Sequence, residues 1–144
     1  MDAHSIWTTA GDLVADTAAE LEEITSAALP EAFNSDHEEL GFDGRSDDEG
    51  PEPEGLALGK VGGRSHAFVG LERVGGVMVY DVSVPTAPTF VTYANNRDRV
   101  TSSGDLGPEG LAFISGDESP TGKPLLAVGN EVSGSTTIFA LRKQ

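Results

Sequence analysis

Short apolar stretches separated by glycine and proline turns recur along the chain from residue 53 onward. The first set predicts strands at 55–59, 66–72, 77–82 and 89–94, and the second set predicts strands at 110–114, 125–129 and 136–141. Short strands spaced about a dozen residues apart are typical of a β-propeller blade of ~40–50 residues. We therefore expect a mainly β chain, a partial β-propeller of about two blades, whose last blade lacks a fourth strand.

The two sets of strands are copies of one sequence unit. PEGLAL at residue 53 matches PEGLAF at residue 108, and AFVGLERVGGVMVYDV matches LAVGNEVSGSTTIFAL farther along, with an insertion of four residues between the two matches. Self-similarity in the same order along successive strands indicates a repeat architecture.

The residues before the repeat follow another pattern. Stretches 5–8 and 13–15 flank TAGD, which predicts a hairpin. Thr17 and Glu20 match a capping box that opens a helix, and Pro30 ends it. We expect five segments: 1–30 as a hairpin and helix from a preceding blade, 31–54 as an acidic loop, 55–94 as a blade, 95–107 as a connecting loop, and 108–144 as the final incomplete blade.

The charge narrows the classes of partner. Twenty-four acidic residues against nine basic ones give a net charge of -15, which disfavours nucleic acid and anionic membranes. The scatter of acids fits a halophilic protein, and cation binding is the alternative. No cysteine is present, so disulfides and thiolate sites are excluded. The amino terminus lacks signal-peptide features, and no apolar run approaches the ~20 residues that direct membrane insertion needs.

The acidic loop 31–54 holds ten acidic residues and a single arginine. Its candidate metal ligands are Asp36, His37, Glu38, Asp47 and Asp48. Hard carboxylate oxygens suit Ca²⁺ or another divalent cation, although the spacing matches no established calcium loop. The alternative is a solvated surface loop.

The repeat also carries glutamates at equivalent positions. Glu54 and Glu109 lie in the two copies of Pro-Glu-Gly, and Glu72 and Glu131 follow the second strand of each copy. Since the first strand of a blade lines the central channel, Glu54 and Glu109 are expected to be neighbours at its mouth. Like charges held close raise a pKa or recruit a cation. Alternatively, each glutamate accepts backbone N–H bonds in a turn.

Three arginines are candidates for holding a phosphate or carboxylate: Arg45, Arg73 and Arg97. A structural salt bridge is the alternative for each. The sequence contains no nucleophile elbow, phosphate-cradling loop or dinucleotide fingerprint.

Taken together, SIWTTAGDLVADTAAELEEITSAALPEAFNSDHEELGFDGRSDDEGPEPEGLALG, HAFVGLERVGGVMVYDVSVPTAP and GDLGPEGLAFISGDESPTGKPLLAVGNEVSGSTTIFAL resemble the choice-of-anchor I domain family. The resemblance implies the carboxy-terminal part of a β-propeller on an exported or cell-surface protein. The family includes mesenchyme-specific cell-surface glycoproteins and atypical alkaline phosphatases. The phosphatases imply metal held by acids such as Asp36, Glu54 and Glu109, with Arg45 or Arg97 on phosphate.

Three functions follow as hypotheses. The first is a binding or structural surface module with a divalent-cation site. The second is part of a metal-dependent phosphoesterase, alkaline phosphatase-like or phytase-like, which acts on a phosphate-containing ligand and is inactive as this chain alone. The third is an inactive truncated remnant. Expected partners are the remaining blades or a second copy at an exposed strand edge, unless residues 4–8 complete the last blade.

Overall fold

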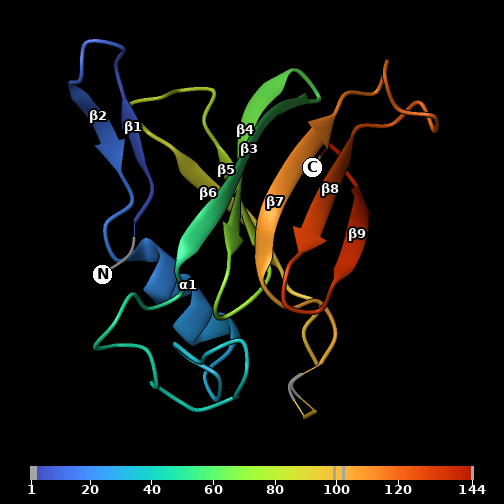
Figure 1. Cartoon of the computed structure of the whole chain (residues 1–144). Helices are drawn as coiled ribbons and strands as arrows, with labels where there is room; N and C mark the ends of the chain where they lie inside the picture. Colours follow the sequence, from blue (N-terminus) through green and yellow to red (C-terminus); the bar gives the residue numbers. More distant parts are fainter. Residues whose placement is uncertain (1–2, 99, 102, 144) are drawn as a thin grey trace.

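The computed structural model describes residues 3–98, 100–101 and 103–143. In these ranges the chain forms three antiparallel sheets and one helix (Figure 1). The elements are β1 (Ser5–Trp7), β2 (Leu13–Asp16), α1 (Glu20–Ala28), β3 (Pro53–Val61), β4 (Arg64–Leu71), β5 (Val77–Asp81), β6 (Thr89–Ala94), β7 (Pro108–Ile114), β8 (Leu125–Asn130) and β9 (Ser135–Ala140). The predicted mainly β fold is confirmed.

The two repeats form two meander sheets, in which each strand pairs with the next along the chain. Strands β3-β4-β5-β6 make the first blade, and β7-β8-β9 make the second. Figure 1 shows the β1–β2 hairpin, the first blade and the second blade side by side from left to right. Within the described residues β1 pairs only with β2, so residues 4–8 do not complete the second blade.

Glycines in the first blade let the second blade approach closely. A Cβ atom at Gly59 would lie 2.3 Å from the ring of Phe113, and one at Gly55 would lie 2.4 Å from Leu111. The Phe113 ring also stacks on Phe68, with 6.0 Å between centroids. The interface core further contains Ala57, Val61, Val77, Leu126 and Val128. The innermost strands β3 and β7 therefore pack face to face, as adjacent propeller blades do.

On the opposite face of the first blade, the helix and the loop after it cover β4 and β5 but leave Leu56 and Leu58 of β3 exposed. Leu21 and Leu29 of this region pack with Met78 and Tyr80 of β5 in a second buried cluster. This packing fixes the amino-terminal segment against β4 and β5. Within the described ranges, no helix has the length and apolar character needed to cross a membrane.

The helix begins differently from the capping-box prediction. Ala19 occupies the N-cap and makes no side-chain capping bond. The Thr17 hydroxyl is instead engaged by His4: it accepts a bond from the His4 N–H at 3.0 Å and donates to the His4 carbonyl at 3.3 Å. Thr17 therefore ties the start of the hairpin to its end, and the predicted capping box is wrong.

Candidate functional site

The repeated Pro-Glu-Gly forms the same irregularity in both blades. In the first blade Pro53 pairs with Leu71 and Gly55 with Gly70, so Glu54 is the extra residue of a β-bulge. In the second blade the register shifts in the same way around Glu109. A bulge redirects the side chain of its extra residue. The motif therefore aims one glutamate of each blade away from the regular alternation of the strand.

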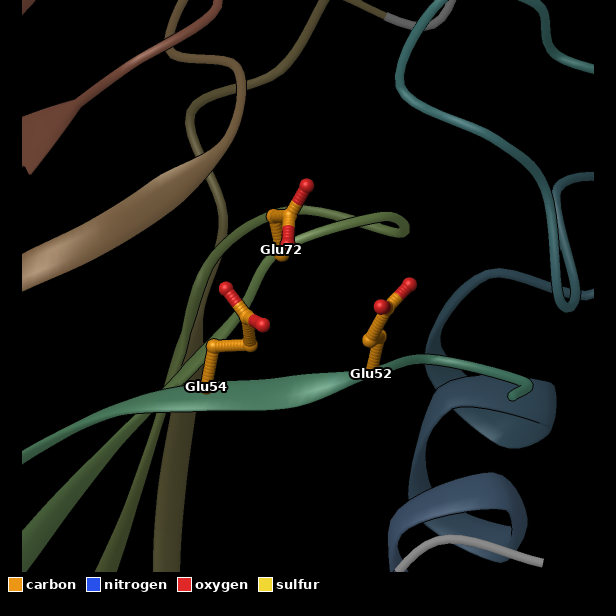
Figure 2. A group of neighbouring side chains, drawn as sticks. All are labelled: Glu52, Glu54 and Glu72. Atoms are coloured by element: carbon orange, nitrogen blue, oxygen red, sulfur yellow. The ribbon is translucent and has the colours of Figure 1, made fainter.

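A backbone bond places a second glutamate beside each bulge. The Glu72 N–H donates to the Glu52 carbonyl at 2.8 Å, and the equivalent Glu131 N–H donates to the Gly107 carbonyl at 2.7 Å. In the first blade, carboxylate oxygens of Glu52, Glu54 and Glu72 lie within 4.8 Å of one another. Figure 2 shows the three side chains directed toward a common space: Glu52 directly before β3, Glu54 in β3 and Glu72 in the turn after β4.

The second blade repeats only part of this cluster. The Glu109 carboxyl hydrogen-bonds that of Glu131, as Glu54 bonds Glu72 in the first blade. Because Gly107 stands where the first blade has Glu52, the third carboxylate is missing there. Glu54 also acts electrostatically on Glu109 across the blades. The two pairs are therefore neighbours at one end of the inner strands.

Crowding of carboxyl groups changes their proton affinity. Burial, the hydrogen bond with Glu54 and the charges of Glu54 and Glu52 raise the pKa of Glu72 to about 7, against the opposing charge of Arg73. The hydrogen bond with Glu131 and its charge likewise raise the pKa of Glu109. Two carboxylates that share one proton form a position where a cation can replace the proton.

Two arginines border the cluster on the side of the acidic loop. Arg73 Nε lies 2.6 Å from Glu52 Oε2, and Arg45 Nη2 lies 2.9 Å from the same oxygen. Arg73 Nη1 is also 3.2 Å from Glu72 Oε1 and 2.8 Å from His37 Nδ1. Although burial opposes it, the bond to Arg73 and the two positive charges lower the pKa of Glu52. Glu52 therefore stays ionised, while Glu72 gains and loses its proton near neutral pH.

His37 and Asp36 reach the edge of this arrangement. His37 Nδ1 lies 3.4 Å from Asp36 Oδ1, and Arg45 Nη1 lies 3.6 Å from Asp36 Oδ2. Since a guanidinium can only donate, unprotonated His37 Nδ1 accepts the bond from Arg73. This bond uses the ring nitrogen that faces the glutamates.

The remaining predicted residues lie apart from the glutamates. Glu38 and Asp48 line a hollow of about 340 Å³ in the acidic loop, together with Asp36 and Arg45. Asp48 lies 3.5 Å from Arg45. Asp47 is exposed in the same loop.

Arg97 has a different environment from the other two arginines. It is 7% exposed, and its guanidinium donates to the backbone carbonyls of Arg73, His37 and Glu39 at 3.2–3.3 Å. Burial lowers its pKa. These contacts join the acidic loop to the first blade, which favours a structural role for Arg97 over an exposed phosphate contact.

Sequence reasoning missed Glu52, which completes the cluster. Its backbone has a positive φ of 56°, a conformation that L-residues adopt rarely. Strain of this kind gathers at functional sites. The available signal was its position between two prolines, directly before the repeated Pro-Glu-Gly.

The comparisons with known proteins support the resemblance to the choice-of-anchor I domain family. The family model for the choice-of-anchor I domain matches residues 3–85. Gigasin-3a of Magallana gigas is 29% identical over 143 residues, which cover 88% of this chain and 50% of the relative. The chain thus spans about half the length of the curated relative that it matches. No solved structure matches the chain.

Proposed function

Because this chain belongs to the choice-of-anchor I domain family, whose members are surface-associated modules, we propose that it is an extracellular binding module with a divalent-cation site. The observation that carries the proposal is the carboxylate cluster of Glu52, Glu54 and Glu72, whose oxygens lie within 4.8 Å of one another. The family supports the surface location, and the carboxylate cluster supports the cation site.

The ligand set suits a hard cation. Ca²⁺ takes six to eight oxygen ligands, and carboxylates are its commonest protein donors. The raised pKa of Glu72 supports the same conclusion, because besides burial it reflects the hydrogen bond with Glu54 and the negative charges of Glu54 and Glu52. A divalent cation bound there replaces the proton of Glu72 and offsets most of the negative charge of the cluster.

The position of the cluster indicates what the cation does. Glu52 ends the acidic loop, Glu54 begins β3, and Glu72 lies in the turn between β4 and β5. A cation that joins the three carboxylates therefore fastens the loop to the first blade. This favours a stabilising role, with the loop surface presented to a binding partner.

A metal-dependent phosphoesterase is the second candidate. Arg73 Nη1 lies 3.2 Å from Glu72 Oε1, so a cation on the glutamates has a guanidinium beside it, as phosphate recognition requires. Against this candidate, Arg73 and Arg45 both bind Glu52. Phosphate release from a simple ester by the chain, with calcium, magnesium, manganese or zinc, is the discriminating assay.

Thermal unfolding with and without calcium tests the cation site. Calcium at a hundred times its dissociation constant stabilises a folded protein by about 2.7 kcal/mol, which raises the Tm by about 5–10 °C for a domain of this size. We expect this shift for the unmodified chain and for Glu31→Gln, which removes an exposed carboxylate of the acidic loop. Glu54→Gln and Glu72→Gln should each abolish it. An equal shift in all four proteins would locate the cation elsewhere.

A further inference from the structure

The contact between the two blades is built from two complementary surfaces. Leu111 and Phe113 project from β7, and they cover Gly55, Gly59 and Gly70 of the first blade. We call the projecting side of an inner strand the knob and the glycine-lined face that it covers the cup. Ala57, which lies between two of these glycines along β3, is 8% exposed under the second blade.

The first blade carries a second knob, and no blade within the described residues covers it. Leu56 and Leu58 are the repeat equivalents of Leu111 and Phe113, yet they are 60% and 66% exposed. A groove of about 310 Å³ runs beside them, bounded by the β1–β2 hairpin and lined in part by Trp7. Large apolar side chains this exposed on neighbouring positions mark an interaction surface.

The second blade carries a second cup that is also open. A Cβ atom at Gly110, the equivalent of Gly55, would meet nothing within 4 Å, and one at Gly129 would meet only Gly110 at 3.6 Å or beyond. Ala112 is exposed where its equivalent Ala57 is buried, and Ile138 on the same face is 54% exposed. The chain thus presents one uncovered knob and one uncovered cup on opposite sides.

We propose that the cup of one chain binds the knob of a second copy, so that copies associate head to tail through their sheet faces. The existing contact of β7 on the first blade supplies the geometry, since the equivalent inner strand, β3, would meet the equivalent face of the second blade. Leu56 and Leu58 occupy the repeat positions of Leu111 and Phe113, so a second copy of this chain carries the surface that fits the open cup. A heterologous contact of this kind closes into a ring when its rotation permits.

Two features shape this contact. Ile114 stands where the first blade has Gly59, so the open cup is shallower, and it would meet Leu58 of the second copy, which is smaller than Phe113. The net charge of -15 repels copies from one another. Association is therefore expected to strengthen with salt, because at about 1 M the Debye length falls to about 3 Å.

The association also extends the carboxylate cluster. Within one chain, Glu54 acts on Glu109 across the blade contact. Repeating that contact between copies places Glu109 of one chain beside Glu54 of the next. The association stands on apolar burial and does not depend on the proposed cation, so it is tested with a chelator present.

Sedimentation velocity of the full chain, at rising concentration in about 1 M salt, tests the proposal. We expect association of the unmodified chain. Ala112→Arg fills the cup and Leu58→Gln removes the knob; each should raise the dissociation constant about tenfold or more, which is about 1.4 kcal/mol. Ala27→Arg, at an exposed position of α1, and Val100→Gln, in the loop between β6 and β7, are the matched controls and should associate as the unmodified chain does.

Mixing the two variants separates this contact from edge-to-edge pairing. The Ala112→Arg chain retains its knob and the Leu58→Gln chain retains its cup, so the mixture should form a heterodimer that neither chain forms alone. The proposal is overturned if the unmodified chain stays monomeric at every concentration. It is equally overturned if both variants associate like their controls, a result that would assign association to the edges of β6 and β9.

Discussion

The shared proton of the Glu54–Glu72 pair gives the folded chain a specific dependence on pH. The pKa of Glu72 rises from 4.5 to about 7 on folding, so the folded state binds this proton more tightly than the unfolded state does. The resulting stabilisation is complete below pH 4.5 and is lost as the pH rises through 7. A shift of this size corresponds to a loss on the order of 3 kcal/mol in the free energy of unfolding.

Glu72→Gln isolates that contribution. The glutamine amide donates to the Glu54 carboxylate as the protonated acid does, but it cannot lose a proton. Urea unfolding with a chelator, between about pH 5 and 8.5, should show equal stability at the acid end and a variant that is more stable by about 2–3 kcal/mol at the basic end. Glu31→Gln is the control for the change in net charge. A difference between the variant and the unmodified chain that does not change with pH would refute the assignment of the proton to this pair.

Three further predictions concern the fold around the site. Gly59→Ala drives a methyl group into the Phe113 ring and should lower the free energy of unfolding by about 1–3 kcal/mol, whereas Gly110→Ala, at the open equivalent face, should be neutral in the same urea titration. Arg97→Met removes the donors that hold the carbonyls of the acidic loop and should cost about 3 kcal/mol, with faster amide hydrogen exchange confined to that loop; unchanged exchange would contradict the structural role. Burial lowers the pKa of His4, so the unfolded state binds a proton there more readily and the folded chain loses stability as the pH falls below 6.5. His4→Phe should remove that loss, which is measured as the Tm at a series of pH values.

The strands could be predicted from the sequence because their signals are local. Apolar stretches bounded by glycine and proline predicted seven strands in the repeat. Each of them overlaps an observed strand, and the range 89–94 coincides with β6. The repeat also identified equivalent glutamates, and the structure brings Glu54 beside Glu72 and Glu109 beside Glu131. Residues at equivalent positions of the sequence repeat therefore lie at equivalent positions in the two blades.

The parts that sequence reasoning missed depend on contacts between distant residues. Arg97 binds carbonyls about 60 residues earlier, at His37 and Glu39, and no local pattern records such a contact. Glu52 joins the cluster through a strained backbone and a bond from Glu72, which lies in the turn after β4. Thr17 was assigned to a capping box because its spacing fitted, but the hydroxyl found a partner in the hairpin.

Calorimetric titration of Ca²⁺ into the chain, at about pH 8 and again at about pH 5.5, tests the cation site most directly. Since the pKa of Glu72 is about 7, we expect saturable binding at the higher pH, weaker binding at the lower pH, and proton release when the titration is run near neutrality. The Glu54→Gln/Glu72→Gln double variant should bind no calcium at the cluster, while Glu31→Gln binds as the unmodified chain does. Undiminished binding by the double variant, or binding that is independent of pH, would contradict the proposed site.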